Sequence, residues 1–186
     1  MVMMTITLLA ALGAALTLAT IAETAIAANY RDGTEAFYAA EAAVEFVVQE
    51  IADVPDWTDV VAEPGRSAFV DGPADGMRDV GAVTLDLAAE TRDVAIAAGA
   101  AGPALVLYAF GRLEDLVPSG SDRPRIYVAV WVADRSSTPV DGTPASEALS
   151  ILGQAYGTRG SRRTVETIVA RVGPSAIRAL SWRELR

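Results

Sequence analysis

The stretch MVMMTITLLAALGAALTLATIAETAIAANYRDGTEAFYAAEAAVEFVVQEIAD, residues 1–53, decides the fold of this chain. Its first 22 residues carry no charged side chain, and a helix of that length is about long enough to cross the hydrocarbon core of a bilayer. From Glu23 onward charges appear, yet apolar residues still recur at helical spacing. The stretch therefore predicts one nearly continuous helix, about 75–80 Å long at the standard rise per residue.

The first part of this helix, residues 1–22, is predicted to be apolar on every side. Such a helix needs lipid or other helices around it, and both of these surroundings are apolar. The same segment can therefore lie in a membrane or in the core of a helix bundle. Its candidate membrane or bundle-core side chains are Met4, Ile6, Leu8, Leu9, Leu12, Leu16, Leu18 and Ile21.

The second part, residues 23–53, is predicted to be amphipathic. With Tyr30 as the first position of a heptad, one apolar stripe runs along it and the charged residues fall off that stripe. We expect Phe37, Tyr38 and Val44 to contact the rest of the chain, and Glu41 to face either solvent or the helix of a neighbouring copy. The candidate residues for packing on the sheet or for contacts between copies are Tyr30, Phe37, Tyr38, Glu41, Val44, Val47 and Ile51.

The chain lacks three residue types that carry much of protein chemistry, namely cysteine, histidine and lysine. Without cysteine no disulfide or thiolate metal site can form, and without histidine the commonest general base and metal ligand is missing. Without histidine or lysine, a hydroxyl nucleophile would have only a carboxylate as its base. Neither G-x-S-x-G nor G-x-x-x-x-G-K occurs. We therefore expect no enzyme activity, no metal site and no cofactor.

The negative charge is concentrated in one part of the chain. Residues 23–65 hold ten acidic residues and one arginine, which accounts for the whole net charge of −9. Residues 66–186 hold fourteen acidic residues and fourteen arginines, so this region is neutral. Nucleic-acid binding needs a basic surface, and we expect no nucleic-acid partner.

A secretory signal peptide is an alternative explanation for the N-terminal apolar run. Ala25-Ile26-Ala27 has the A-x-A form of a cleavage site. Three features favour a retained helix instead: no basic residue precedes the run, the run is longer than a usual signal core, and the helical pattern continues through the site. A secreted product would begin near Ala28.

The remaining residues, 54–186, predict one domain built on a sheet. Pro55 and Pro64-Gly65 end the helical region, and Arg159-Gly160 lies between two apolar runs as a hairpin signal. The expected strands are 80–87, 104–113, 125–134, 148–158 and 161–172, with 67–70 as a short edge strand, 90–99 as a helical turn or loop, and 175–185 as a last strand or short helix. The fold class is therefore α+β, with a long N-terminal helix packed against an antiparallel sheet of about four or five strands.

Side-chain patterns within these runs predict which faces are buried. The near-continuous apolar runs at 104–113 and 125–134 predict central strands with one side facing the helix. In 161–172, charged and apolar residues share the strand, so we expect a water-exposed face that carries Arg163, Glu166 and Arg171. Trp57 and Trp182 are expected as packing anchors after the helix and in the tail.

Several stretches resemble type IV pilins, and in particular the PilX-like pilus-assembly proteins, which are minor pilins. NYRDGTEAFYAAEAAVE resembles the family's N-R-x-x-x-x-A-F-x-A-A-E-A-A signature. The other matching stretches are the opening MVMMTITLLAALGAAL, the P-x-W exit in VPDWTDVV, and the later segments YVAVWVAD and ALSWREL. The first 60 residues carry the specific match, and the later segments match more loosely. The family begins with a short basic leader ending in glycine, and we expect such a leader upstream of Met1.

The resemblance implies a structural subunit of a type IV pilus or related filament that acts in pilus assembly, with adhesion or motility as further roles. It implies other pilin subunits and the assembly machinery as partners, and membrane lipid before assembly. The expected location is the bacterial inner membrane, spanned once, or the extracellular pilus. The chain then divides into a membrane or filament-core half-helix (1–22), an amphipathic half-helix (23–53) and a sheet domain (54–186). A membrane-anchored binding domain that never polymerises and a type II secretion pseudopilin are the alternatives.

Overall fold

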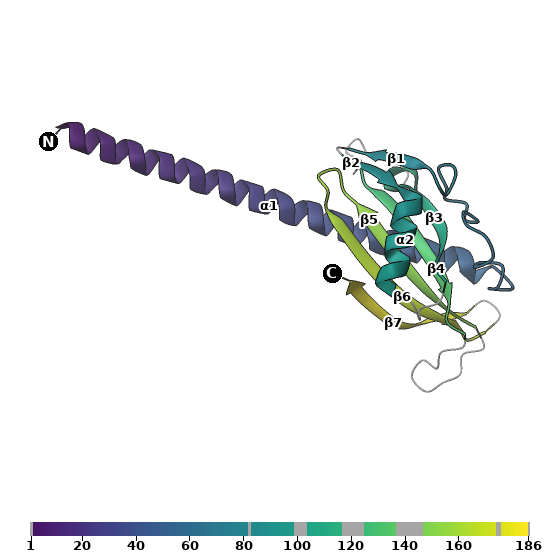
Figure 1. The fold of residues 1–186 in the computed structure, drawn as a ribbon. Helices are drawn as coiled ribbons and strands as arrows, with labels where there is room; N and C mark the ends of the chain where they lie inside the picture. Colours follow the sequence, from purple (N-terminus) through teal and green to yellow (C-terminus); the bar gives the residue numbers. More distant parts are fainter. Residues whose placement is uncertain are drawn as a thin grey trace.

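A single unbroken helix, α1 (Val2–Ala52), dominates the computed structural model of this protein. Figure 1 shows that its first half projects far beyond the rest of the chain, while its second half lies along a sheet. The long N-terminal helix predicted from the sequence is therefore confirmed. The structure describes residues 2–81, 83–98, 104–116, 125–136, 147–173 and 176–185.

The sheet is antiparallel and has five strands in the order β3-β4-β5-β6-β7. Together with the helix it confirms the α+β, pilin-like arrangement. The expected hairpin at Arg159-Gly160 joins β5 to β6, and Gly160 adopts a positive φ of 81° there. The strands are β3 (Val106–Arg112), β4 (Tyr127–Asp134), β5 (Ala148–Tyr156), β6 (Arg162–Arg171) and β7 (Ile177–Leu185). The tail is thus a strand, and a one-turn helix, α3 (Leu113–Leu116), follows β3.

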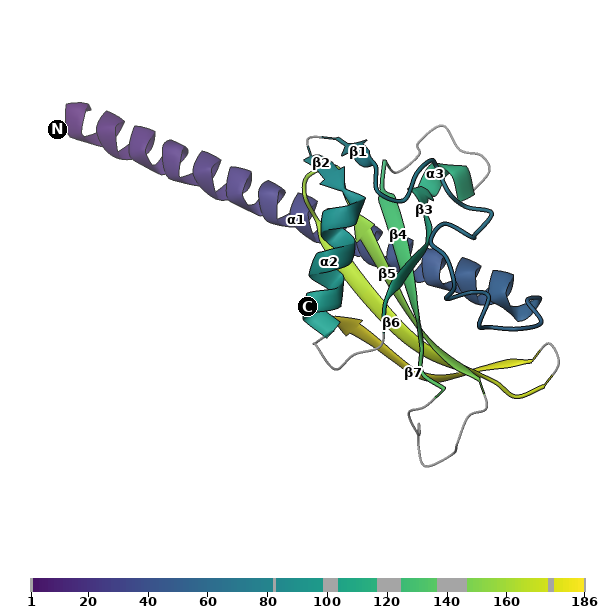
Figure 2. The same ribbon diagram turned by 45° about the vertical axis from the view of Figure 1, so that its right-hand side comes forward.

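The sheet is covered on both faces. Helix α1 packs on one face, and a second helix, α2 (Leu87–Ala98), lies across the other together with a small hairpin (Figure 2). In β4, Val128, Val130 and Val132 belong to the core on the α1 side, whereas Tyr127, Ala129 and Trp131 belong to the core on the α2 side. Two buried faces explain why β4 reads as a continuous apolar run.

The segment expected as one strand at 80–87 is instead a hairpin followed by a helix. Its strands are β1 (Met77–Val80) and β2 (Val83–Asp86), and Gly81 has a positive φ of 63° between them. The carboxylate of Asp86 accepts hydrogen bonds from the backbone N–H groups of Ala88 and Ala89, both at 3.0 Å, and so caps the first turn of α2. The prediction of one strand over 80–87 was wrong, because a turn at Gly81 interrupts it and the Asp86 cap begins helix α2 at Leu87.

Strand β3 lies at the outside of the strand order, where a central strand was expected. The segment expected as an edge strand at 67–70 makes only an isolated bridge, Val70 to Phe110, but it runs beside β3. The Phe110 N–H donates to the Phe69 carbonyl at 2.9 Å, and the Gly65 N–H donates to the Leu107 carbonyl at 2.8 Å. These bonds cover part of the edge of β3, which explains its apolar sequence.

Helix α1 approaches the sheet closely because small residues line its buried face. Ala36, Ala39, Ala40 and Ala43 are all buried, and they lie toward β5 and β6. At Gly153 on β5 a Cβ atom would lie 2.5 Å from Val44 Cγ2 and 2.9 Å from the Ala40 carbonyl oxygen. Real Cβ atoms do not come this close, so the helix can sit at this depth only because Gly153 has no side chain.

We predict that Gly153→Ala destabilises the folded domain. The added methyl group must push the helix backbone away from β5, and overpacking of this kind costs about 1–3 kcal/mol. At roughly 2–4 °C per kcal/mol for a chain of this size, the midpoint of thermal unfolding should fall by several degrees. The measurement is thermal unfolding of the full chain in detergent, followed by tryptophan fluorescence.

Gly13→Ala is the matched control, because no atom lies within 4 Å of the Cβ it would add. This control should leave the midpoint unchanged or raise it slightly, since alanine favours helix over glycine. Equal midpoints for Gly153→Ala and the unmodified chain would contradict the close packing described above.

Candidate assembly surface

The projecting part of α1 makes no tertiary contact that buries it. Its eight predicted membrane or bundle-core side chains, Met4 to Ile21, are between 55% and 78% exposed. α1 is also the one helix in the described part of the chain that is long and apolar enough to cross a membrane. This segment, called the stalk below (residues 2–22), therefore presents apolar surface that its own domain leaves uncovered.

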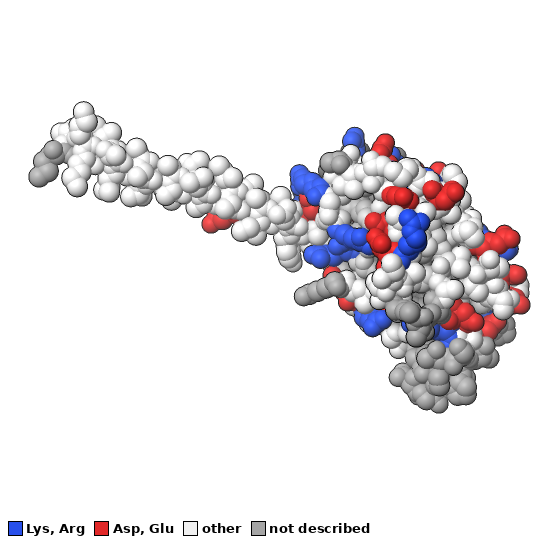
Figure 3. All heavy atoms as spheres, viewed as in Figure 1, with Lys and Arg blue, Asp and Glu red and all other residues white. Residues whose placement is uncertain are grey.

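Three threonine hydroxyls of the stalk are satisfied within the helix itself. The hydroxyls of Thr7, Thr17 and Thr20 donate to the backbone carbonyls four residues earlier, at 2.7, 2.9 and 3.0 Å. A hydroxyl bonded in this way loses little when water is removed around it. The first charged residue of the chain is Glu23, and the visible face in Figure 3 shows the N-terminal part of the helix without charged residues, whereas the domain carries both signs of charge. The stalk is therefore suited to an apolar environment on every side.

The amphipathic half of α1 divides its predicted contact residues into two groups. Val44, Val47 and Ile51 are buried in the core between helix and sheet, and Phe37 is partly buried at the margin of that core. Tyr30 and Tyr38 are instead 77% and 62% exposed. Tyr38 was expected to be a core contact to the sheet, but its exposure places it outside the core; it borders a groove that Arg163 and Glu184 of the sheet also line. Glu41 is half-buried, and no ion pair of Glu41 is found among the described residues.

Two polar contacts, which sequence reasoning did not anticipate, fix α1 to the domain. Near the stalk, the guanidinium of Arg159 in the β5–β6 hairpin donates to both carboxylate oxygens of Asp32, at 2.8 and 3.1 Å. Near the end of the helix, Glu50 accepts hydrogen bonds from the Ser67 hydroxyl at 2.6 Å and the Ala68 N–H at 2.7 Å. The sequence places both Asp32 and Glu50 off the apolar stripe. Their partners are far along the chain, so no local pattern reveals them.

Aromatic side chains gather near the point where α1 leaves the domain. The rings of Phe37 and Tyr38 are 5.4 Å apart, and those of Phe37 and Trp182 are 6.0 Å apart, both in edge-to-face geometry. Trp182 lies on β7, the outermost strand, and is 50% exposed. The four residues Tyr30, Phe37, Tyr38 and Trp182 form what we call the aromatic patch.

Comparison with known proteins finds a similarity in the N-terminal part of the chain. Residues 1–45, which include the stalk and three of the four residues of the aromatic patch, match the family model described as PilX N-terminal. The N-terminal quarter of the chain is therefore similar to that of PilX-like type IV pilins. No curated protein and no solved structure matches it. PilX-like pilins are structural proteins, and the long apolar helix fits a location in a membrane or a pilus.

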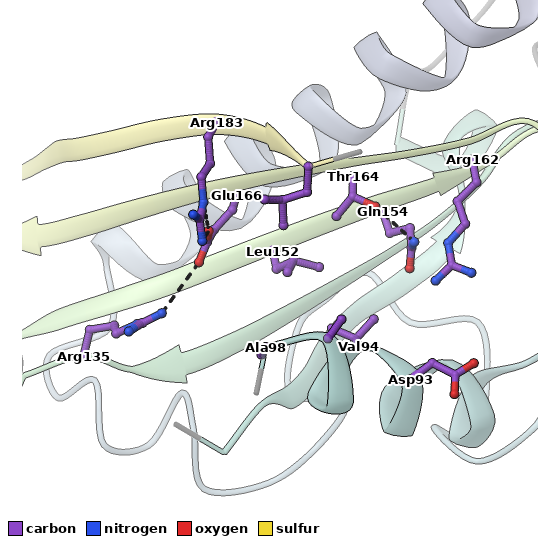
Figure 4. A pocket seen from close by; sticks show the side chains of 12 residues that line it. Asp93, Val94, Ala98, Arg135, Leu152, Gln154, Arg162, Thr164, Glu166 and Arg183 are labelled. Atoms are coloured by element: carbon purple, nitrogen blue, oxygen red, sulfur yellow. Dashed lines mark hydrogen bonds and ion pairs between the residues drawn. The ribbon is translucent and has the colours of Figure 1, made fainter. Parts of the chain in front are cut away.

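The chain also has a polar cleft on the opposite face of its sheet, between α2 and strands β5 to β7 (Figure 4). Glu166 lies at one end of it and is only 5% exposed. Its carboxylate accepts a hydrogen bond from the Ser150 hydroxyl at 2.8 Å, is bonded by the guanidinium of Arg183, and lies 3.8 Å from Arg135. The expected water-exposed face of β6 was therefore wrong at Glu166, because β7 and the end of β4 bring arginines over it.

The other end of the cleft is also polar. Arg162 pairs with Glu90 of α2 at 2.8 Å, and the Gln154 amide donates to the Thr164 hydroxyl at 3.1 Å. The Tyr156 hydroxyl donates to Gln154 at 2.7 Å and approaches Glu90 at 3.1 Å. Burial, together with the nearby Glu90 carboxylate, raises the pKa of Tyr156, so its hydroxyl remains a proton donor.

We predict that Glu166→Gln destabilises this face of the domain. The variant keeps the shape of the side chain but leaves the guanidiniums of Arg135 and Arg183 without their shared carboxylate. Glutamine keeps one carbonyl acceptor but places an NH2 donor where the second carboxylate oxygen met a guanidinium. A buried hydrogen-bonding group left unpaired costs about 1–3 kcal/mol, which thermal unfolding of the full chain would register as a lower midpoint.

Asp93→Asn is the matched control, since Asp93 lines the same cleft but is exposed. A surface change of this kind should stay within about 0.5 kcal/mol of the unmodified chain. If both variants unfolded at the same temperature as the unmodified chain, the ion-paired network around Glu166 would contribute nothing to stability.

Proposed function

We propose that this chain is a minor-pilin-like structural subunit of a type IV pilus or related filament and that it acts in pilus assembly. In this proposal residues 1–22 span the bacterial inner membrane once before assembly, and residues 23–53 carry the sheet domain formed by residues 54–186. The stalk then leaves the lipid and enters the core of a filament, where the helices of other pilin subunits surround it. Pilus assembly machinery would move the subunit from the membrane into the filament. Adhesion or motility would be a role of the assembled filament.

The observation that carries the proposal is the stalk itself. It is uncharged, exposed on every side and internally hydrogen-bonded, and it lies within the PilX-type segment. A helix of this kind loses little free energy when lipid is exchanged for other apolar helices, because neither environment must solvate a charge. A subunit that first lies in a membrane and then enters a filament needs a helix that is similarly stable in lipid and among other apolar helices.

A type II secretion pseudopilin would use the two halves of the helix in the same way. Only the identity of the neighbouring subunits separates the two assignments. We place the pilus first because the matched family model is that of PilX.

The second candidate function is a membrane-anchored binding domain that does not polymerise. The polar cleft between α2 and β7 favours it, because Arg135, Arg162 and Arg183 line a recess whose floor includes the apolar side chains of Val94 and Leu152. Such a recess would suit a ligand that combines an anionic group with an apolar part. This function requires a chain that stays in the membrane and is absent from filaments.

We predict that Leu12→Asp removes the chain from both membrane and filament. A charged side chain near the centre of an apolar helix costs about 2.5–3.5 kcal/mol on insertion scales, which is roughly a 100-fold shift in partition. The measurement compares the amount of full chain in washed membranes and in sheared filaments from cells that express it with its native partners.

Ile96→Asp is the control, because Ile96 is 76% exposed on α2 and carries the same change outside the stalk. It should leave both fractions unchanged. An unmodified chain that is never found in, or crosslinked to, a filament would refute the subunit proposal and favour the membrane-anchored binding domain. Retention of Leu12→Asp in filaments would show that the stalk does not enter an apolar core.

A further inference from the structure

The Glu166 end of the polar cleft holds more hydrogen-bond donors than its acceptors can satisfy. Two guanidiniums, those of Arg135 and Arg183, lie on either side of the single carboxylate of Glu166 (Figure 4). That carboxylate already accepts a hydrogen bond from the Ser150 hydroxyl at 2.8 Å and is bonded by Arg183. Each guanidinium carries several N–H donors, so this end retains unused donors and an excess of one positive charge.

Arg135 is the cation that Glu166 does not satisfy. Its guanidinium lies 3.8 Å from the Glu166 carboxylate, which is beyond hydrogen-bond range. Its Nε atom is buried and has no hydrogen-bond partner among the described residues. Buried polar groups in folded proteins almost always have a partner, because the bond to water that they lose must be replaced. An oxygen atom of a bound ligand would supply the acceptor that Arg135 lacks.

The floor of the cleft next to this charged end is apolar. Leu152 of β5 lines it together with Val94 and Ala97 of α2. Glu166 and Thr164, which mark its two ends, are two residues apart on β6, so the apolar floor is about 7 Å long. The cleft has a volume of about 480 Å³. Sites for small molecules typically measure about 300–1,000 Å³, so the cleft has room for one small ligand.

The distribution of charge favours a ligand with one negative charge. At the far end Arg162 is paired with Glu90 at 2.8 Å, and Asp93 adds an exposed carboxylate to the lining. Only the Glu166 end therefore attracts an anion, and the excess there is a single charge. A phosphate ester would bring a second negative charge without a partner. A peptide would place amide groups on the apolar floor, where the side chains offer them no hydrogen bonds.

We propose that the cleft binds a small monocarboxylate with a compact apolar body. The carboxylate accepts hydrogen bonds from Arg135 and Arg183, and the apolar body lies over Leu152 and Val94 and ends near Thr164. This inference rests on the second candidate function and deepens it by naming the chemical class of the ligand. It holds whether or not the chain also enters filaments.

The test uses 4-(4-fluorophenyl)butanoate as the probe, because it combines one carboxylate with an apolar body of suitable length. Fluorine NMR measures its dissociation constant for the full chain in lipid nanodiscs, and empty nanodiscs give the blank for partition into lipid. We expect saturable binding of the acid. The corresponding amide has the same body without the charge, and it should bind at least about tenfold more weakly.

Arg135→Gln removes the cation that lacks a hydrogen-bonded partner, so it should weaken binding of the acid by about tenfold or more. Arg112→Gln is the matched control. Arg112 makes a similarly long ion pair, 4.0 Å from Glu114, and lies on β3 outside the cleft. This control should change the dissociation constant by less than about twofold.

A second pair of variants tests the position of the ligand without changing a charge. Ala97 and Ala95 are both exposed on α2, but only Ala97 lines the cleft. Ala97→Trp should fill the cleft and abolish binding of the acid, whereas Ala95→Trp should bind it normally. Equal thermal unfolding midpoints for the two variants show that the loss does not act through the fold.

The outcomes separate this inference from the proposed function. The inference is overturned if the acid shows no saturable binding, if acid and amide bind equally, or if the acid binds Ala97→Trp as tightly as the unmodified chain. None of these results changes whether the chain is found in filaments, which decides the subunit function. A chain that is absent from filaments but binds the acid through Arg135 would remove the subunit function and support the cleft as a binding site.

Discussion

The close packing of α1 on β5 is the contact on which the rest of this structure depends. Ala40 and Val44 lie against Gly153, where there is no room for a side chain. Because the helix is held at this depth, residues of α1 and of the α1-facing sides of β4, β5 and β6 form one continuous core. This core fixes where α1 leaves the domain, and so it sets the direction in which the stalk projects.

The charged residues of α1 reinforce the same arrangement at both ends of the contact. Asp32 is held by Arg159 where α1 leaves the domain, and Glu50 is held by the 67–68 segment near the end of the helix. An exposed ion pair such as Asp32–Arg159 contributes little stability by itself, so its main effect is to fix the position of α1 against the domain. Between these two polar contacts, the small buried residues of α1 pack closely against the sheet. The stalk makes no contact that buries it against its own domain.

Helix α2 and the β1–β2 hairpin form a second layer on the face of the sheet opposite α1. Helix α2 and its hairpin bury the other face of the sheet, which gives this modest domain a second apolar core around Trp131, whose indole N–H donates to the Thr91 hydroxyl at 3.0 Å. The layer covers the sheet only in part, and the cleft around Glu166 lies where the cover ends. One face of the sheet is therefore devoted to holding the long helix, and the other retains a polar recess.

The sequence by itself determined the long helix, its division into an uncharged and an amphipathic half, most of the strands and the PilX-like character. These features depend on periodicity, charge and turn residues, which are local properties of the chain. Only the tertiary structure decided which off-stripe residues find partners. Asp32 meets Arg159 of the β5–β6 hairpin, and Glu166 meets Arg183 of β7. Tyr38 remains exposed, and Trp182 completes the aromatic patch from the opposite end of the chain. The physical reason is that these contacts join segments distant in sequence, and their geometry depends on how deeply α1 packs at Gly153.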